Sequence, residues 1–142
     1  MPKEWPEILP CVQMRITRPT AQFDRVIAFY RDGLGLPVIF SYADDHDYDG
    51  MMFGLPGRDY HLEITQYKGD GTCPRPSPDT LLVFYIPDLG ARDQAVARLQ
   101  AMGYHPVAPR NPYWASHGMT IPDPDGWHIV LMNTPGFGED IV

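Results

Sequence analysis

Residues 29–36 read FYRDGLGL and mark the end of an amphipathic helix. A single apolar stripe recurs at helical spacing and consists of Phe23, Val26, Ile27, Tyr30 and Leu34. Glycine commonly ends a helix because it adopts the left-handed backbone conformation without steric cost. The stretch therefore predicts a helix that buries one side and stops before residue 36.

Strand-like runs flank this helix on both sides. One run, residues 11–17, precedes it, and three runs follow at residues 38–42, 51–55 and 60–67. Polar or glycine-rich turns separate the runs. The first half of the chain therefore predicts one strand, one helix and three further strands.

The second half of the chain repeats this order. A strand, a helix ended by glycine and three short strands are predicted at residues 81–86, 95–102, 104–108, 119–121 and 127–132. The sequence LPV follows Gly35 and HPV follows Gly103, an internal repeat of roughly 67 residues. We predict an α+β fold of two βαβββ modules, residues 8–67 and 80–134, with a linker at 68–79 and a tail at 135–142.

Composition excludes several classes of function. The chain has 142 residues, 44% of them hydrophobic, and a net charge of −7 without a basic run, which argues against nucleic acid as a partner. No window approaches the ~20 apolar residues of a membrane span, and the start lacks the pattern of a signal peptide. Cys11 and Cys73 lack metal-ligand spacing and are interpreted as reduced thiols. We expect a cytoplasmic protein.

Four stretches together resemble the vicinal oxygen chelate superfamily, which includes glyoxalase I, bleomycin-resistance proteins and extradiol dioxygenases. They are FYRDGLGL at 29–36, HLEI at 61–64, IPDL at 86–89 and DPDGWHIVL at 123–131. The resemblance covers nearly the whole chain in the right order. It implies that the two modules form a curled mixed sheet, a half-barrel around a pocket, with helices outside.

The resemblance also implies where a metal would be held. In metal-dependent members, strands of both modules supply four ligands, and these positions fall here on Arg15, Glu63, Leu81 and Val130. Only Glu63 is a ligand type, because arginine, leucine and valine have no lone pair to donate. We therefore predict no cofactor and the loss of the usual metal site.

Arg15 and Glu63 would then point to the same place. Our hypothesis is that the Arg15 guanidinium substitutes for the cation and holds the Glu63 carboxylate in a charge-assisted pair. An anionic ligand could compete for Arg15, whose planar fork suits carboxylate or phosphate. The alternative is a purely structural ion pair.

A displaced metal site is a second possibility in this sequence. His61 and Glu63 are two residues apart on a strand and share one face, and His128 lies on the corresponding strand of the second module. Two histidines and one carboxylate could bind one divalent metal ion or act as acid–base catalysts. The alternative is that they are polar residues lining a wet cavity.

Further candidates for ligand binding are polar or aromatic side chains. The full predicted set is Arg15, Gln13, Glu63, Phe53, Tyr85, Tyr113 and Trp114. Aromatic walls hold planar or apolar ligands, although ordinary core packing would also explain single aromatic residues. Residues 111–118 form either a rim of the pocket or a subunit interface.

Three functions are compatible with these observations. The favoured one is a protein that binds a small organic ligand, anionic or aromatic, as bleomycin-resistance proteins do. The alternative is a metal-dependent isomerase, lyase or dioxygenase of the same superfamily, and the third is a partner-binding module. The superfamily resemblance also implies a homodimer.

Overall fold

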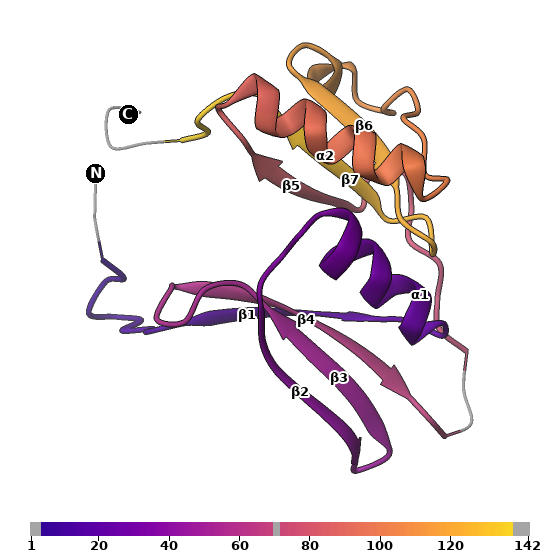
Figure 1. Cartoon of the computed structure of the whole chain (residues 1–142). Helices are drawn as coiled ribbons and strands as arrows, with labels where there is room; N and C mark the ends of the chain where they lie inside the picture. The colour runs from indigo at the N-terminus through magenta and orange to yellow at the C-terminus, as the bar shows by residue number, and fades with distance from the viewer. Residues whose placement is uncertain (1–3, 70–71, 138–142) are drawn as a thin grey trace. The chain divides into compact units, whose positions relative to one another are not determined.

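The computed structural model describes residues 4–69 and 72–137 (Figure 1). The elements are β1 (Met14–Pro19), α1 (Phe23–Ile27), η1 (Ala28–Gly33), β2 (Val38–Asp45), β3 (Tyr48–Phe53), β4 (Tyr60–Tyr67), β5 (Leu81–Tyr85), α2 (Leu89–Ala101), η2 (Pro112–Ala115), β6 (Gly118–Pro122) and β7 (His128–Met132). The first half has the predicted strand, helix and three further strands, and the α+β class is confirmed. No helix in the described residues is long and apolar enough to cross a membrane.

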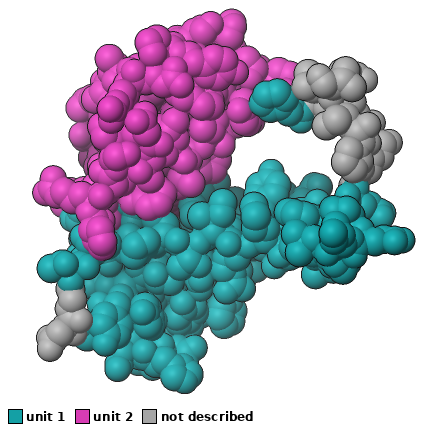
Figure 2. Space-filling view, turned by 180° about the vertical axis from the view of Figure 1, so that it is seen from behind, with its two compact units in different colours: residues 1–23, 36–73, 137–142 teal, residues 24–35, 74–136 magenta. Residues whose placement is uncertain are grey.

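The chain divides into two compact units (Figure 2). Unit 1 holds β1 to β4, and unit 2 holds β5 to β7 together with α2, η2 and residues 24–35. The helix of the first module therefore groups with the second sheet. The module boundaries inferred from the repeat stay a prediction.

The sheet of unit 1 is mixed. Its strand order is β1-β4-β3-β2, with β1 parallel to β4 and the other pairs antiparallel. The helical segment α1–η1 separates β1 from β2, so these two strands do not form a hairpin. β1 instead pairs in parallel with β4, the last of the three antiparallel strands that follow the helix. This crossover puts residues about fifty positions apart side by side, as in the register pair Thr17 and Glu63.

The sheet of unit 2 repeats the arrangement with one strand fewer. Its order is β5-β7-β6, and α2 lies across it in Figure 1. The strand predicted at 104–108 is wrong: Val107 makes only an isolated antiparallel bridge with Thr120. Pro106 and Pro109 flank this bridge, and proline has no N–H to donate to a ladder.

The helix that opens at Phe23 widens before it ends. Residues 28–33 form a π-helix, and the Leu34 N–H donates to the Phe29 carbonyl at 2.9 Å. At Gly33 a Cβ atom would lie 2.5 Å from a methyl carbon of Leu99, so glycine permits the close contact between η1 and α2. The Arg98 guanidinium donates to the Gly33 and Leu34 carbonyls at 3.0 and 3.3 Å and completes this helix end.

The core of unit 2 is apolar with one buried polar link. Fully buried side chains include Val26, Phe29, Leu99, Ile121, Ile129 and Leu131. Each contributes about 1.5–3 kcal/mol through burial. The Tyr30 hydroxyl donates to the Asp123 carboxylate at 2.6 Å. The other oxygen of Asp123 accepts the N–H groups of Asp125 and Trp127, which builds the predicted turn before β7.

Candidate functional site

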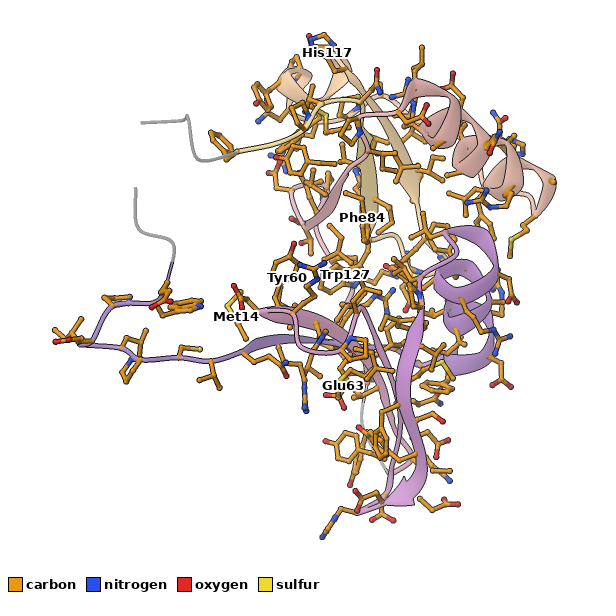
Figure 3. The ribbon with its side chains drawn as sticks, turned by 60° about the vertical axis from the view of Figure 1, so that its left-hand side comes forward. Met14, Tyr60, Glu63, Phe84, His117 and Trp127 are labelled. Atoms are coloured by element: carbon orange, nitrogen blue, oxygen red, sulfur yellow. The ribbon has the colours of Figure 1, made fainter. Side chains whose placement is uncertain are left out.

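One face of the unit 1 sheet carries most of its polar side chains. Successive residues of a strand point to opposite faces, and directly paired residues share a face. The Glu63 face, defined by the registers of the four strands, consists of Arg15, Thr17, Phe40, Tyr42, Tyr48, Gly50, Met52, His61, Glu63, Thr65 and Tyr67. Glu63 is labelled on it in Figure 3.

The Glu63 carboxylate lies at the centre of this face and is only 6% exposed. The Thr17 hydroxyl donates to Oε1 at 3.1 Å, and the Tyr42 hydroxyl donates to Oε2 at 2.9 Å. Nη1 of Arg15 lies 3.6 Å from Oε1. A buried carboxylate is stable only when its charge is compensated in this way. Both oxygens of the Glu63 carboxylate therefore have a hydrogen-bond donor, and Arg15 lies within ion-pair distance of one of them.

Tyr42 reaches Glu63 across an intervening strand. It lies on β2, whereas Glu63 lies on β4, and its ring passes over Gly50 of β3. A Cβ atom at position 50 would overlap the ring, so the path exists because residue 50 is glycine. Burial, and then the hydrogen bond to the Glu63 carboxylate, raises the pKa of Tyr42 to about 12. The phenol is thus a hydrogen-bond donor at neutral pH.

Arg15 is the accessible cation of this face. Its side chain is 47% exposed, against 8% for the side chain of Glu63. The 3.6 Å separation is an ion pair without a short hydrogen bond, and a guanidinium has five N–H donors. Arg15 therefore neutralises Glu63 and retains donors for a second anion.

His61 lies beside Arg15 and is buried. The two residues are register partners on β4 and β1, and His61 is only 6% exposed. Its Nε2 lies 2.6 Å from the Leu55 carbonyl oxygen. Its Nδ1 is buried without a hydrogen-bond partner in the described part of the chain. Gly54 packs against the ring: a Cβ atom there would lie 2.7 Å from Cδ2 of His61.

Aromatic rings continue the Glu63 face over β2, β3 and β4. Phe40, Tyr48 and Tyr67 are 56%, 41% and 49% exposed. The ring centroids of Tyr48 and Tyr67 are 5.1 Å apart, and those of Phe40 and Tyr42 are 6.1 Å apart. Tyr67 lies six residues along β4 from His61, the register partner of Arg15, so the Tyr48–Tyr67 pair lies far from the guanidinium. Tyr42 shares the Glu63 carboxylate with Arg15, so Tyr42 and the neighbouring Phe40 are the rings that a planar, negatively charged molecule at Arg15 would meet.

Comparison with known proteins identifies relatives along the whole fold. Residues 14–65 match the YycE-like N-terminal domain and residues 79–133 match the YycE-like C-terminal domain. The uncharacterized protein YycE of Bacillus subtilis (strain 168) is 52% identical over 124 residues, which cover 87% of this chain and 89% of YycE. The chain belongs to the YycE-like family.

Solved structures place this YycE-like chain in its superfamily. A crystal structure of a YycE protein of unknown function from Bacillus subtilis has a TM-score of 0.87 at 48% identity, covering 96% of this chain and 99% of that one. Glyoxalase I of Leishmania major has a TM-score of 0.65 at 21% identity, covering 84% of each chain. TnmS3, an antibiotic binding protein from Streptomyces sp. CB03234, has a TM-score of 0.60 at 24% identity, covering 85% and 93%. The Bacillus subtilis structure, at 48% identity, is described as a putative glyoxalase/fosfomycin resistance protein, so the predicted vicinal oxygen chelate superfamily is confirmed.

The donor set of this YycE-like chain does not fit the usual metal of that superfamily. Of the four positions that the resemblance assigns, only Glu63 can donate a lone pair, and both of its oxygens accept hydrogen bonds. Val130 is fully buried, and Leu81 lies on β5. Among the described residues no three His, Cys, Asp or Glu side chains gather closely enough to hold a metal ion.

The structure brings together three of the predicted site residues. Arg15, His61 and Glu63 share the Glu63 face, and the expected ion pair between Arg15 and Glu63 is present. Phe53 is 1% exposed and pairs with Leu62, so it lies on the opposite face of the sheet. Gln13 precedes β1 and donates from its side chain to the Arg58 carbonyl at 3.0 Å.

The remaining predicted residues belong to unit 2. Tyr85 ends β5, with Gly136 packed against its ring, and Tyr113 and Trp114 of η2 make an edge contact at 4.9 Å. His128 begins β7, and its Nδ1 is buried without a partner among the residues described. Their roles in binding stay predictions.

Sequence reasoning missed two side chains that contact Glu63. Thr17 could have been found, because it is two residues from Arg15 on the same strand and shares its face. Tyr42 could not, because the register of β2 shifts between Tyr42 and Asp45. A shift of this kind changes which residues face the site and leaves no clear mark in the sequence.

Proposed function

We propose that this YycE-like chain binds a small organic molecule that carries an anionic group and an aromatic ring, without the usual metal of its superfamily. The anionic group contacts Arg15, and the ring contacts Tyr42 and Phe40 of the Glu63 face. The protein acts as a binder of the glyoxalase/bleomycin-resistance type.

One observation carries the proposal. Glu63 is the only metal-ligand type at the four superfamily positions, and Thr17 and Tyr42 donate to its two oxygens while Arg15 neutralises it. A divalent cation at this carboxylate would lie next to the guanidinium and be repelled by it. A second anion at Arg15 meets donors that Glu63 leaves free.

The surroundings of Arg15 support an aromatic ligand. Tyr42 donates to the carboxylate that Arg15 neutralises, and the ring of the half-exposed Phe40 lies 6.1 Å from that of Tyr42. TnmS3, which shares the fold, is described as an antibiotic binding protein, so this scaffold hosts binding of organic molecules. The alternative, a metal-dependent isomerase, lyase or dioxygenase that uses the usual metal positions, requires donors that Leu81 and Val130 lack.

A titration with 3-phenylpropionate, followed by amide chemical shifts, tests the proposal. We expect shifts in β1 and β4 and a Kd that rises about tenfold or more in Arg15→Met, because charge-assisted hydrogen bonds are lost. Arg31→Met is the matched control, since Arg31 is 48% exposed and paired with Asp32. Equal affinity in the two variants would refute the contact between the anion and Arg15. No binding of either 3-phenylpropionate or its 2-hydroxy analogue 3-phenyllactate to the wild type would refute the proposed ligand class.

Metal content is measured separately. Protein purified without chelator or nickel resin is expected to contain no stoichiometric transition metal. One equivalent of Mn, Fe, Zn or Ni that is lost in Glu63→Gln would refute the metal-free proposal and favour the enzyme.

We also propose that the protein is a cytoplasmic homodimer. Sedimentation equilibrium measures its mass, which we expect to be twice the 16.1 kDa of one chain. A monomer mass at micromolar concentration would contradict the dimer.

A further inference from the structure

His61 has a buried hydrogen-bonding atom that the fold does not use. A carbonyl oxygen only accepts, so the Nε2 atom of His61, 2.6 Å from the Leu55 carbonyl, must carry the ring proton. In the neutral ring Nδ1 then has a lone pair and acts as an acceptor. No described residue donates to it. An unpaired acceptor in the interior loses its hydration without compensation.

His61 lies directly beside Arg15, so a ligand bound at Arg15 would lie next to this acceptor. His61 and Arg15 are register partners on parallel strands, which lie about 4.8 Å apart, and their side chains share the Glu63 face. The hydroxyl groups of Thr17 and Tyr42 already donate their hydrogen bonds to Glu63. The free donors of Arg15 and the free acceptor of His61 are therefore neighbouring, complementary groups.

We propose that the ligand carries a hydroxyl or N–H group next to its anionic group, and that this donor binds Nδ1 of His61 while Arg15 binds the anion. The ligand class is then a 2-hydroxy or 2-amido acid with an aromatic substituent. This inference rests on the proposed function and narrows its ligand class. It makes His61 the residue that selects for the donor.

Selection follows from the direction of the hydrogen bond. A site with a buried acceptor rejects an analogue that lacks the donor, because the acceptor then loses water without gaining a partner. A methyl ether in place of the hydroxyl presents an oxygen lone pair to the lone pair of Nδ1, which is repulsive. Recognition thus depends on the proton and not only on the shape of the ligand.

Three matched probes test the inference: 3-phenyllactate, 3-phenylpropionate and 2-methoxy-3-phenylpropionate. The first has the hydroxyl donor, the second lacks it, and the third has the oxygen without the proton. We expect 3-phenyllactate to bind about five- to tenfold more tightly than 3-phenylpropionate, and the ether to bind more weakly than either. In His61→Phe the preference for 3-phenyllactate should vanish. The control His105→Phe changes an exposed histidine of unit 2 and should keep the preference.

A spectroscopic measurement on the unmutated protein avoids dependence on the folding of the variant. The ¹⁵N resonance of the unprotonated Nδ1 of His61 should move upfield when 3-phenyllactate binds, and stay in place with 3-phenylpropionate. Equal affinities for these two probes, or an unmoved Nδ1 resonance at saturation, would overturn the inference and leave the proposed function intact. Failure of both probes to bind would refute the proposed function itself.

Discussion

The two sheets share one register but not one chemistry. In unit 1, Arg15 pairs with His61 and Thr17 with Glu63; in unit 2, Leu81 pairs with His128 and Val83 with Val130. These pairs are related by the internal repeat. The backbone plan was therefore kept in both modules, whereas the side chains diverged.

The differences between the sheets are confined to a few positions. Each module has glycine at the corresponding place, Gly50 and Gly118, but only Gly50 lies under a tyrosine that reaches a carboxylate. The counterpart of β2 in unit 2 is the single bridge at Val107. Unit 2 therefore has no strand that could carry an equivalent of Tyr42. A charged site of this kind therefore needs three things: the carboxylate, the side chains that donate hydrogen bonds to it, and the strands that position those side chains.

The largest expected effect comes from placing the carboxylate in the wrong sheet. Val130→Glu buries a carboxyl group where Val83 and Thr120 are its register partners and Arg15 has no counterpart. We expect a loss of about 4–5 kcal/mol in the free energy of unfolding, measured by urea denaturation. Val130→Leu introduces a side chain about as large as glutamate but without the charge, and should lower the free energy of unfolding by about 1–3 kcal/mol. Equal losses would show that volume, not charge, distinguishes the sheets.

The reverse exchange should cost less. Glu63→Val leaves Thr17 and Tyr42 without their acceptor, and we expect a loss of about 2–3 kcal/mol. The triple variant Arg15→Leu, Thr17→Val, Glu63→Val reproduces the residues of unit 2 and removes two of the unpaired groups. We expect it to be more stable than Glu63→Val alone. A triple variant that is less stable would mean that the charged cluster does not act as one network.

Gly50 and Gly118 differ in the rigidity of the atoms that a larger residue would meet. At Gly118 a Cβ atom would strike the Trp114 carbonyl oxygen of the backbone, whereas at Gly50 it would strike the movable ring of Tyr42. We expect Gly118→Ala to lose about 2–3 kcal/mol and Gly50→Ala about 1 kcal/mol, the latter similar to Tyr42→Phe. Thermal unfolding measures both. The opposite order would contradict the assignment of Gly50 as the path of Tyr42.

The smallest effect concerns alkaline pH. The pKa of Tyr42 is raised to about 12, above the 10.0 of an unperturbed tyrosine. The folded chain therefore keeps this proton longer than the unfolded chain, and the associated stability is present below pH 10 and falls as the pH rises toward 12. The melting temperature of the wild type should drop more steeply over this range than that of Tyr42→Phe. Parallel curves would show that the Glu63 contact does not hold the proton.

The fold was largely predictable, and the site only in part. Apolar spacing around residues 23–30 and the repeated glycine stops indicated the modules, because helix and strand periods are local properties. The ion pair between Arg15 and Glu63 followed from the resemblance. Thr17 was recoverable from strand alternation, but the strand expected at 104–108 was wrong because prolines flank Val107.

The sequence alone indicated most of the element order, the superfamily through its resemblance, and the residue types at the four superfamily positions, since each can be read from neighbouring residues. Only the tertiary structure decided that Tyr42 crosses Gly50 to reach Glu63, that Phe53 faces away, and that Nδ1 of His61 has no partner in the described residues. Those facts depend on strand register and on packing between residues far apart in the chain. Strand register and long-range packing cannot be inferred from a local sequence pattern.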